Sequence, residues 1–404
     1  MAIFFRATNR QEESFLLFSN VVICCPPIII GCAPSSGSTL LRTLLGRHPS
    51  IASGGEVALL DKRALLKEPP ERYRALIATW LAKGYPADFL GPSEELFEEL
   101  DDYPWDRESL RAMCLSGPGY PEMLEAFWRR TVETRGARRW LDKCPSNIYC
   151  FDLISALYPG AKFLHLIRDA RDTVVSYCGR GASPFRSVSR WYYATVLGLL
   201  YSSWPNYLRI SYERLVQEPV KVLREICEFI DEPYCEEMLE PNPTGGKPRH
   251  AGWRLAAADA VEASSVGRFH GELTERQRAM FNQIVLSDSA ARPLQQANIG
   301  SIPSPVELQR QLGYDTDLLS GASPLTDIEL DTAWLEFENY QTRMRYRHGV
   351  EVECQVLLKG ARGRTQIPAL GRQCQTTAAA AALDRAAITT ISSGAAVGVR
   401  RIAT

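Results

Sequence analysis

The chain has 404 residues, of which 45% are hydrophobic and 23% charged. These values are ordinary for a globular protein with a sizeable core, and the length allows one large domain or two of ordinary size. A formal net charge of -1 gives no general affinity for nucleic acid or an anionic membrane, so any anion site must be local. The 11 cysteines contain no C-x-x-C pair, which argues against a zinc ribbon or a disulfide framework and suits a reducing compartment.

No segment is predicted to span a membrane. The strongest apolar stretch, residues 21–32, is interrupted by Pro26-Pro27, whereas a spanning helix needs about 20 apolar residues. The N-terminal segment lacks the basic start, long apolar centre and cleavage site of a secretory signal. We therefore expect a cytoplasmic protein with neither a membrane span nor nucleic acid as a partner.

Short β-branched runs alternate with amphipathic stretches through the first 232 residues. Strands are predicted at 28–31, 138–143, 161–169 and 207–212, and helices at 38–46, 54–68, 172–180, 187–204 and 220–232. This alternation indicates an α/β fold with a mainly parallel central sheet flanked by helices. Residues 71–135 alternate helical stretches with Pro/Gly breaks and are predicted to form a helical insertion or lid, and residues 326–349 a polar helix.

The stretch GCAPSSGSTLLR, residues 31–42, links the first predicted strand to the first helix. A triphosphate-binding loop requires lysine directly after its last glycine, but Ser38 follows Gly37, so magnesium-dependent triphosphate hydrolysis is disfavoured. What remains is a turn of amides and hydroxyls that faces an anion at a helix N-terminus. The hydroxyls belong to Ser35, Ser36, Ser38 and Thr39. The alternative is a serine-rich turn that only caps the helix, and the motif alone does not decide between them.

Three later segments place polar groups at strand ends. Arg168 ends a strand in LIRDARDTVVS, Lys143 follows another in LDKCP, and Tyr212 follows a third in YERLVQEP. Ligands of parallel sheets bind at the carboxyl ends of the strands, where the loop after Ile30 and Arg168 both fall.

Together these motifs resemble those of the sulfotransferase family, particularly its bacterial and tyrosylprotein branches. The resemblance rests on PSSGSTLLRTLLGRHPSI, PGAKFLHLIRDARDTVVSY and YERLVQEP and covers roughly residues 26–314. It implies a P-loop-NTPase-like three-layer sandwich that moves a sulfuryl group from 3′-phosphoadenosine 5′-phosphosulfate (PAPS) to an acceptor, with the bisphosphate PAP as product and no metal. Residues 1–25 are then an N-terminal extension, 315–359 a C-terminal helical extension and 360–404 a low-complexity, disordered tail.

The resemblance also implies roles for particular residues. The 5′-phosphosulfate loop comprises Ser35, Ser36, Gly37, Ser38, Thr39 and Leu40. Lys143 would face the bridging oxygen of the donor and stabilise the leaving group. The 3′-phosphate and the rest of the donor would be held by Arg168, Ser176, Arg180, Tyr212 and Arg268. One departure is Ser35, which stands where the family usually has a basic residue, so one expected cation is absent.

Glu56 in GGEVALL occupies the place of the carboxylate base that some branches use to activate the acceptor hydroxyl. Its alternative is a helix-start acid that the helix dipole stabilises. The alternatives are a solvated surface lysine for Lys143, a structural salt bridge to Asp169 or Asp172 for Arg168, and a core aromatic for Tyr212.

Two rival functions stay open at this stage. A non-catalytic nucleotide-binding protein is suggested by Ser35, and a P-loop-like kinase by the loop, although the missing lysine counts against the kinase. The acceptor is also open between a tyrosyl group, a carbohydrate and a small-molecule hydroxyl.

Overall fold

The computed structural model describes residues 25–61, 65, 70–75, 102–117, 119–240, 261, 263–286, 303–317, 326 and 328. Several predicted features lie outside these residues: nearly all of the N-terminal extension, residues 76–101 of the predicted insertion, most of the polar helix at 326–349, and the tail.

The described residues contain a sheet of five parallel strands. They are β1 (Ile28–Cys32), β2 (Ile51–Ser53), β3 (Arg139–Lys143), β4 (Lys162–Ile167) and β5 (Tyr207–Ser211), in the order β2-β3-β1-β4-β5. In the registers of β1, Ile30 lies opposite Lys143 of β3, and Cys32 lies opposite Leu166 of β4. The loop that follows β1 therefore begins between the carboxyl ends of β3 and β4.

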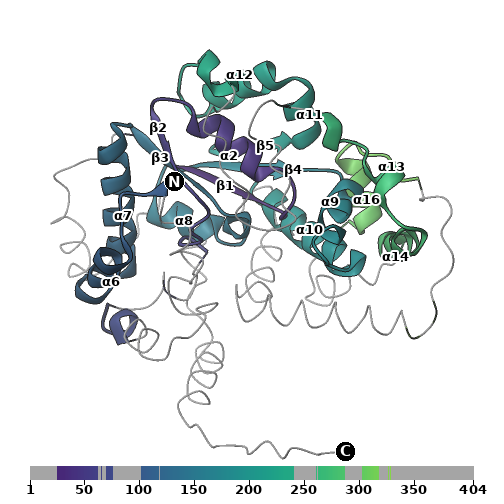
Figure 1. Ribbon diagram of the computed structural model, residues 1–404, viewed down its shortest axis with the longest axis horizontal. Helices are drawn as coiled ribbons and strands as arrows, with labels where there is room; N and C mark the ends of the chain where they lie inside the picture. Colours follow the sequence, from purple (N-terminus) through teal and green to yellow (C-terminus); the bar gives the residue numbers. More distant parts are fainter. Residues whose placement is uncertain are drawn as a thin grey trace, which may run out of the picture.

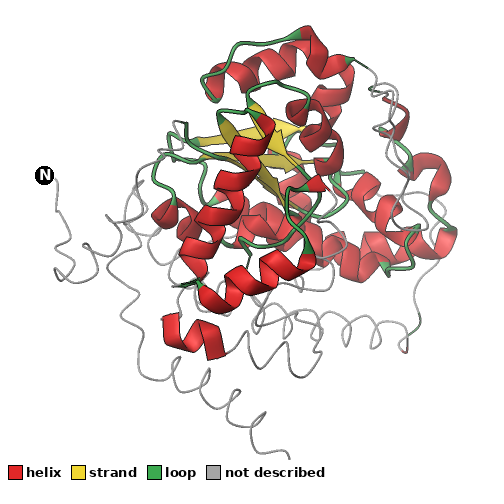
Figure 2. Cartoon of the chain, turned by 60° about the vertical axis from the view of Figure 1, so that its left-hand side comes forward, coloured by secondary structure: helices red, strands yellow, loops and turns green. Residues whose placement is uncertain are grey.

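Helices cover both faces of the sheet, as Figures 1 and 2 show. One layer is formed by α2 (Ser38–Gly46), α11 (Tyr212–Gln217) and α12 (Pro219–Phe229). The other includes η2 (Pro145–Tyr149), α8 (Phe151–Leu157) and α10 (Pro184–Leu199). Further helices are α6 (Arg107–Ser116), α7 (Tyr120–Arg135), α9 (Ala170–Cys178), α13 (Phe269–Glu272), α14 (Glu275–Leu286) and α16 (Pro305–Gln311). The predicted α/β three-layer architecture is confirmed.

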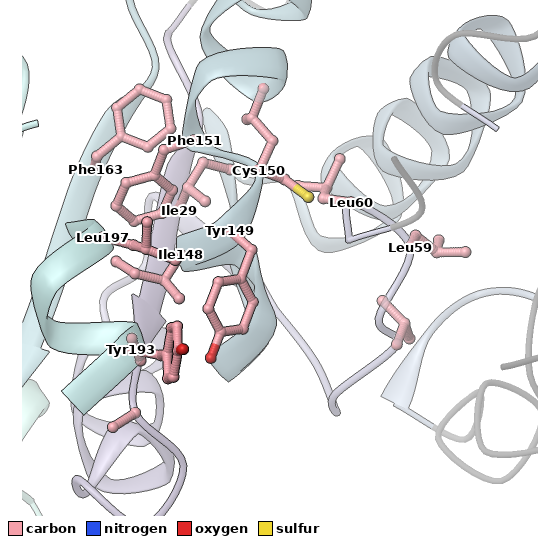
Figure 3. Close-up of a cluster of buried hydrophobic side chains, with 14 of the residues drawn as sticks. Ile29, Leu59, Leu60, Ile148, Tyr149, Cys150, Phe151, Phe163, Tyr193 and Leu197 are labelled. Atoms are coloured by element: carbon pink, nitrogen blue, oxygen red, sulfur yellow. The ribbon is translucent and has the colours of Figure 1, made fainter. Parts of the chain in front are cut away.

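The central strand β1 is apolar on both faces because both are covered by helices. Ile28 and Ile30 belong to a buried cluster with α2 and α12, whereas Ile29 belongs to a second cluster with η2, α8 and α10. This alternation follows from the two-residue period of a strand. Figure 3 shows Ile29 among Ile148, Phe151 and other side chains of the second cluster. The rigid packing holds the end of β1, and hence the loop after it, in place.

Most predicted elements are present within a few residues of their expected bounds, but two differ. The short strand β2 was not predicted, and the prediction of a helix at 54–68 is wrong over residues 54–61, which are not helical. Ala58 has φ of 49°, which an α-helix excludes. The carbonyls of Gly55 and Leu59 accept hydrogen bonds from tyrosine hydroxyls instead of from helical amides.

Candidate active site

The loop after β1 has the backbone form of an anion site. Ser35 (φ 68°) and Gly37 (φ 92°) are both left-handed, and α2 begins directly after them. Gly37 is the N-cap of α2 and makes no side-chain hydrogen bond. The first amides of the helix therefore receive no acceptor from a cap side chain. Amides in such a turn at a helix N-terminus attract a negatively charged group.

Two hydroxyls in this loop are buried without a hydrogen-bond partner among the described residues. They are Ser35 Oγ and Ser36 Oγ, and Ser36 is fully buried. An unpaired buried hydroxyl costs about 1–3 kcal/mol, so such groups normally have partners. The oxygens of a phosphate or sulfate group would satisfy both hydroxyls, which makes the loop fit an anionic donor.

Lys143 and Glu56 meet beside this loop. Lys143 Nζ contacts Glu56 Oε2 in an ion pair. The lysine side chain is only 4% exposed and the glutamate 33%, so the surface-lysine alternative for Lys143 is wrong. Cys32, at the end of β1, lies between the ion pair and the loop. Its thiol hydrogen-bonds to Ser38 and interacts electrostatically with Lys143 and Glu56. Burial raises the pKa of this thiol to about 12.

The segment that carries Glu56 is fastened by residues of the predicted insertion. Tyr103 Oη donates to the Gly55 carbonyl at 2.8 Å, and Tyr120 Oη donates to the Leu59 carbonyl at 2.7 Å. Arg42 of α2 donates to the Gly54 carbonyl, so its guanidinium is engaged there. Because these contacts replace a helix, the helix-start alternative for Glu56 is wrong.

Arg168 lies on the opposite side of the loop, directly after β4. Its side chain is 5% exposed, and it donates from Nη1 to the Ser35 carbonyl at 3.2 Å and from Nη2 to the Ser265 carbonyl. Trp191 Nε1 fixes its main chain by donating to the Arg168 carbonyl at 2.9 Å. Of the two salt bridges considered as its structural alternative, Asp172 lies at 3.9 Å, whereas Asp169 pairs with Arg171 at 2.7 Å.

Tyr212 supports both the loop and Arg168. It is 4% exposed, and its ring lies 4.4 Å from the Arg168 guanidinium carbon. The ring also lies so close to Gly37 that a Cβ at that position would overlap it. The left-handed φ and this close approach both require glycine at position 37.

Asp172, which the sequence offered only as a helix-start acid or a salt-bridge partner of Arg168, anchors a distant segment. Its carboxylate accepts from the amides of Gly267 at 2.7 Å and Phe269 at 3.2 Å, and burial raises its pKa. These bonds hold the segment with Ser265 and Arg268 against α9. The only hint in the sequence was an acidic residue near the start of a helix. Acidic residues are common there in any helix, so the hint does not single out an anchoring role.

The remaining predicted donor-binding residues have the following places. Arg268 forms an ion pair with Glu272, one helical turn further on, and this bond raises its pKa. Ser176 lies half-buried on α9. Arg180 is exposed just after α9 and interacts electrostatically with Glu56, while partial burial lowers its pKa. Ser176, Arg180 and Arg268 keep their predicted roles as proposals.

Two negative findings concern the described residues. Among them, no helix is long and apolar enough to cross a membrane. The same part of the chain holds no group of three or more His, Cys, Asp or Glu side chains arranged for a metal ion.

The parallel sheet places the loop after β1 between two buried cations at its strand ends, an arrangement that suits an anionic ligand. A model of the sulfotransferase family matches residues 26–236, more than half of the chain, and the chain therefore belongs to that family. The recognised resemblance is thus confirmed.

Individual relatives are more distant. The chain is 27% identical over 224 residues to a putative protein-tyrosine sulfotransferase of Caenorhabditis briggsae, with 52% of this chain and 68% of the relative covered. It is 26% identical over 235 residues to protein-tyrosine sulfotransferase A of Caenorhabditis elegans, with 55% and 54% covered. The match thus spans only about half of that second relative. Among solved structures, the sulfotransferase domain of the olefin synthase from Synechococcus PCC 7002 is similar, with a TM-score of 0.47, 21% identity, and coverage of 72% of this chain and 96% of that one.

Proposed function

We propose that the chain transfers a sulfuryl group from PAPS to a hydroxyl acceptor. One observation carries the proposal: Lys143 ends β3 and Arg168 follows β4, the two strands that pair with β1, so they lie on either side of the loop after it. PAPS carries a 5′-phosphosulfate and a separate 3′-phosphate. A central anion loop with a cation on each side suits a ligand with two separate anionic groups.

The donor would bind through residues of three segments. The loop amides and the hydroxyls of Ser35 and Ser36 would hold the 5′-phosphosulfate, with the first turn of α2 behind them. Arg168 would bind the 3′-phosphate, with Ser176, Arg180 and Arg268 as further proposed contacts. Arg268 would have to exchange its partner Glu272 for the phosphate.

Sulfuryl transfer resembles phosphoryl transfer, in which positioning and charge stabilisation matter more than covalent help. Negative charge accumulates on the leaving phosphate, and Lys143 would stabilise it there. Glu56 would accept the proton of the acceptor hydroxyl, since it is the more exposed member of the pair and is reachable from solvent. Lys143 is thus paired with the base in the resting protein and turns to the leaving group when the donor binds.

The serine at position 35 affects how well the loop could stabilise the negative charge of the donor. The family's usual cation is missing at this position, but the Arg168 guanidinium reaches the Ser35 carbonyl at 3.2 Å. This bond supports the loop, and Lys143 would supply the positive charge that Ser35 does not. Arg42 does not take part, because its guanidinium is held by Gly54.

For the acceptor we propose a tyrosyl hydroxyl. The support is that curated relatives are named protein-tyrosine sulfotransferases. Carbohydrate and small-molecule hydroxyls are the competing classes.

The test is a transfer assay with ³⁵S-labelled PAPS against tyrosyl peptides, phenols and carbohydrates. We expect label in the peptide fraction without added metal. Binding of PAP without transfer to any acceptor would favour the non-catalytic alternative. Magnesium-dependent turnover of ATP would favour the kinase.

A further inference from the structure

A chain of polar side chains leads away from the second carboxylate oxygen of Glu56. The Cys144 thiol is 3.7 Å from Glu56 Oε1 and 2.9 Å from Ser146 Oγ. Ser146 Oγ in turn donates to Asp61 Oδ2 at 2.6 Å. Cys144 is 3% exposed and Asp61 2%, so solvent does not compete strongly for these bonds. The two oxygens of Glu56 thus have different partners: Lys143 on one and Cys144 on the other.

The thiol has a single hydrogen and two acceptors within reach. Burial, together with the charges of Glu56, Asp61 and Asp142, raises the pKa of Cys144 well above its usual range, so the sulfur keeps its hydrogen. Ser146 uses its own hydrogen on Asp61, so the S–H group points either to the Ser146 oxygen or to Glu56. A carboxylate whose cation has left is the stronger acceptor of the two.

Lys143 cannot hold Glu56 and the leaving group of the donor at the same time. When Lys143 turns to the donor, Glu56 loses this ion pair at the step in which its orientation matters most. Cys144 comes directly after Lys143 in the sequence. Its sulfur is held in place by Ser146, which is in turn hydrogen-bonded to Asp61.

We propose that Cys144 is a positioning residue that takes over Glu56 when Lys143 turns to the donor. This inference rests on the proposed function. The thiol then donates to Glu56 Oε1 and keeps the carboxylate directed at the acceptor. No covalent bond of the thiol forms or breaks.

Other charged and titratable groups also face Glu56 from the packed elements. They are Lys143 and Asp142 of β3, Cys32 at the end of β1, and Arg180 after α9. The Cys32 thiol hydrogen-bonds to Ser38 and Arg180 is exposed, whereas the Cys144 sulfur lies 3.7 Å from a Glu56 oxygen.

The first test is infrared spectroscopy of the S–H stretching band, assigned by its loss in Cys144→Val. We expect PAP binding to lower the frequency of this band, and Lys143→Met to lower it without any ligand. Glu56→Gln should abolish both shifts. Cys227→Val, which removes an equally buried thiol in α12, should leave the band unchanged. A Cys144 band that stays constant in PAP and in Lys143→Met overturns the inference.

The second test is kinetic. Cys144→Val should lower kcat about tenfold, the scale of one hydrogen bond to a charged group, with the KM for PAPS unchanged. Cys144→Ser should restore most of the rate, and in Glu56→Gln the Cys144→Val change should have no further effect. Equal effects in both backgrounds would show that the thiol only packs. If the wild-type protein neither binds PAP nor transfers label, the proposed function is wrong. In that case the infrared spectrum of Lys143→Met still tests whether the Cys144 thiol donates to Glu56.

Discussion

Lys143 Nζ contacts Glu56 Oε2 although 87 residues separate them in the sequence. The parallel pairing of β2 and β3 explains the contact, because Ser53 of β2 lies opposite Leu141 of β3. Glu56 comes three positions after Ser53, and Lys143 comes two positions after Leu141. β1 pairs with the other edge of β3, so the loop after β1 begins beside the same pair. A buried cation, a partly exposed carboxylate and the loop after β1 therefore meet at the carboxyl ends of the strands.

Replacing Glu56 by glutamine should separate catalysis from binding. The amide keeps the shape of the side chain but cannot accept the acceptor proton, so transfer should fall by about 10²–10⁴-fold, the usual contribution of general base catalysis. PAP affinity, measured by calorimetry, should change little. Glu228→Gln, an exposed glutamate on α12, is the matched control and should transfer at the wild-type rate. Full activity of Glu56→Gln would remove Glu56 from the mechanism.

Gly37→Ala should destroy the donor site while the rest of the fold survives. The new Cβ would overlap the Tyr212 ring, and the φ of 92° disfavours any side chain. We expect PAP binding to be lost in calorimetry. Gly136→Ala is the control, because Gly136 has φ of 60° but open space around its Cβ position. If Gly37→Ala bound PAP as well as Gly136→Ala, the loop would not be the anion site.

Asp142→Asn should change the pH dependence of stability. Burial raises the pKa of Asp142 from 3.8 to about 7, so between these values the folded state keeps a proton that the unfolded state releases. The free energy of unfolding therefore falls as the pH rises from about 4 to about 7, by up to about 1.4 kcal/mol per pH unit for this group alone. Asparagine can still accept the Asn147 bond but does not titrate.

The measurement for Asp142→Asn is urea unfolding across this pH range. The stability of the variant relative to wild type should increase from pH 4 to pH 7. A constant difference would show that Asp142 is already ionised in the folded protein.

Asp172→Ala should release the segment that contains Ser265 and Arg268 from α9. Two amides lose their acceptor, so unfolding should become easier by about 1–3 kcal/mol. Since the same segment approaches Arg168, PAP affinity should also fall. Thermal unfolding and calorimetry measure the two effects. An unchanged PAP affinity in the destabilised variant would mean that the segment takes no part in donor binding.

The sheet and most of its helices followed from local patterns in the sequence. Buried strands such as β1 are short, β-branched and followed by turn residues, and α2 shows a clear helical period. The segment around Glu56 could not be predicted in this way. Its apolar residues suggested a helix, but its conformation is fixed by Tyr103 and Tyr120, whose contacts come from 48 and 61 residues away.

The candidate site shows the same division. Charged groups at predicted strand ends led to Lys143 and Arg168, and the resemblance to the family led to Glu56. Their burial was not visible. The chain from Glu56 through Cys144 and Ser146 to Asp61 was not visible either, since two of its contacts join residues 85 or more positions apart. Cysteine and serine have no local pattern that distinguishes such a contact from ordinary packing.

The most direct test of the central claim compares the binding of PAP with that of 5′-AMP, which lacks only the 3′-phosphate. If Arg168 binds that phosphate, PAP should bind about 10–100-fold more tightly, the range expected for a charge-assisted contact. Arg168→Ala should remove most of this preference and leave the binding of 5′-AMP nearly unchanged. Equal affinities for PAP and 5′-AMP in the wild-type protein would contradict a two-phosphate donor site at the ends of β1, β3 and β4.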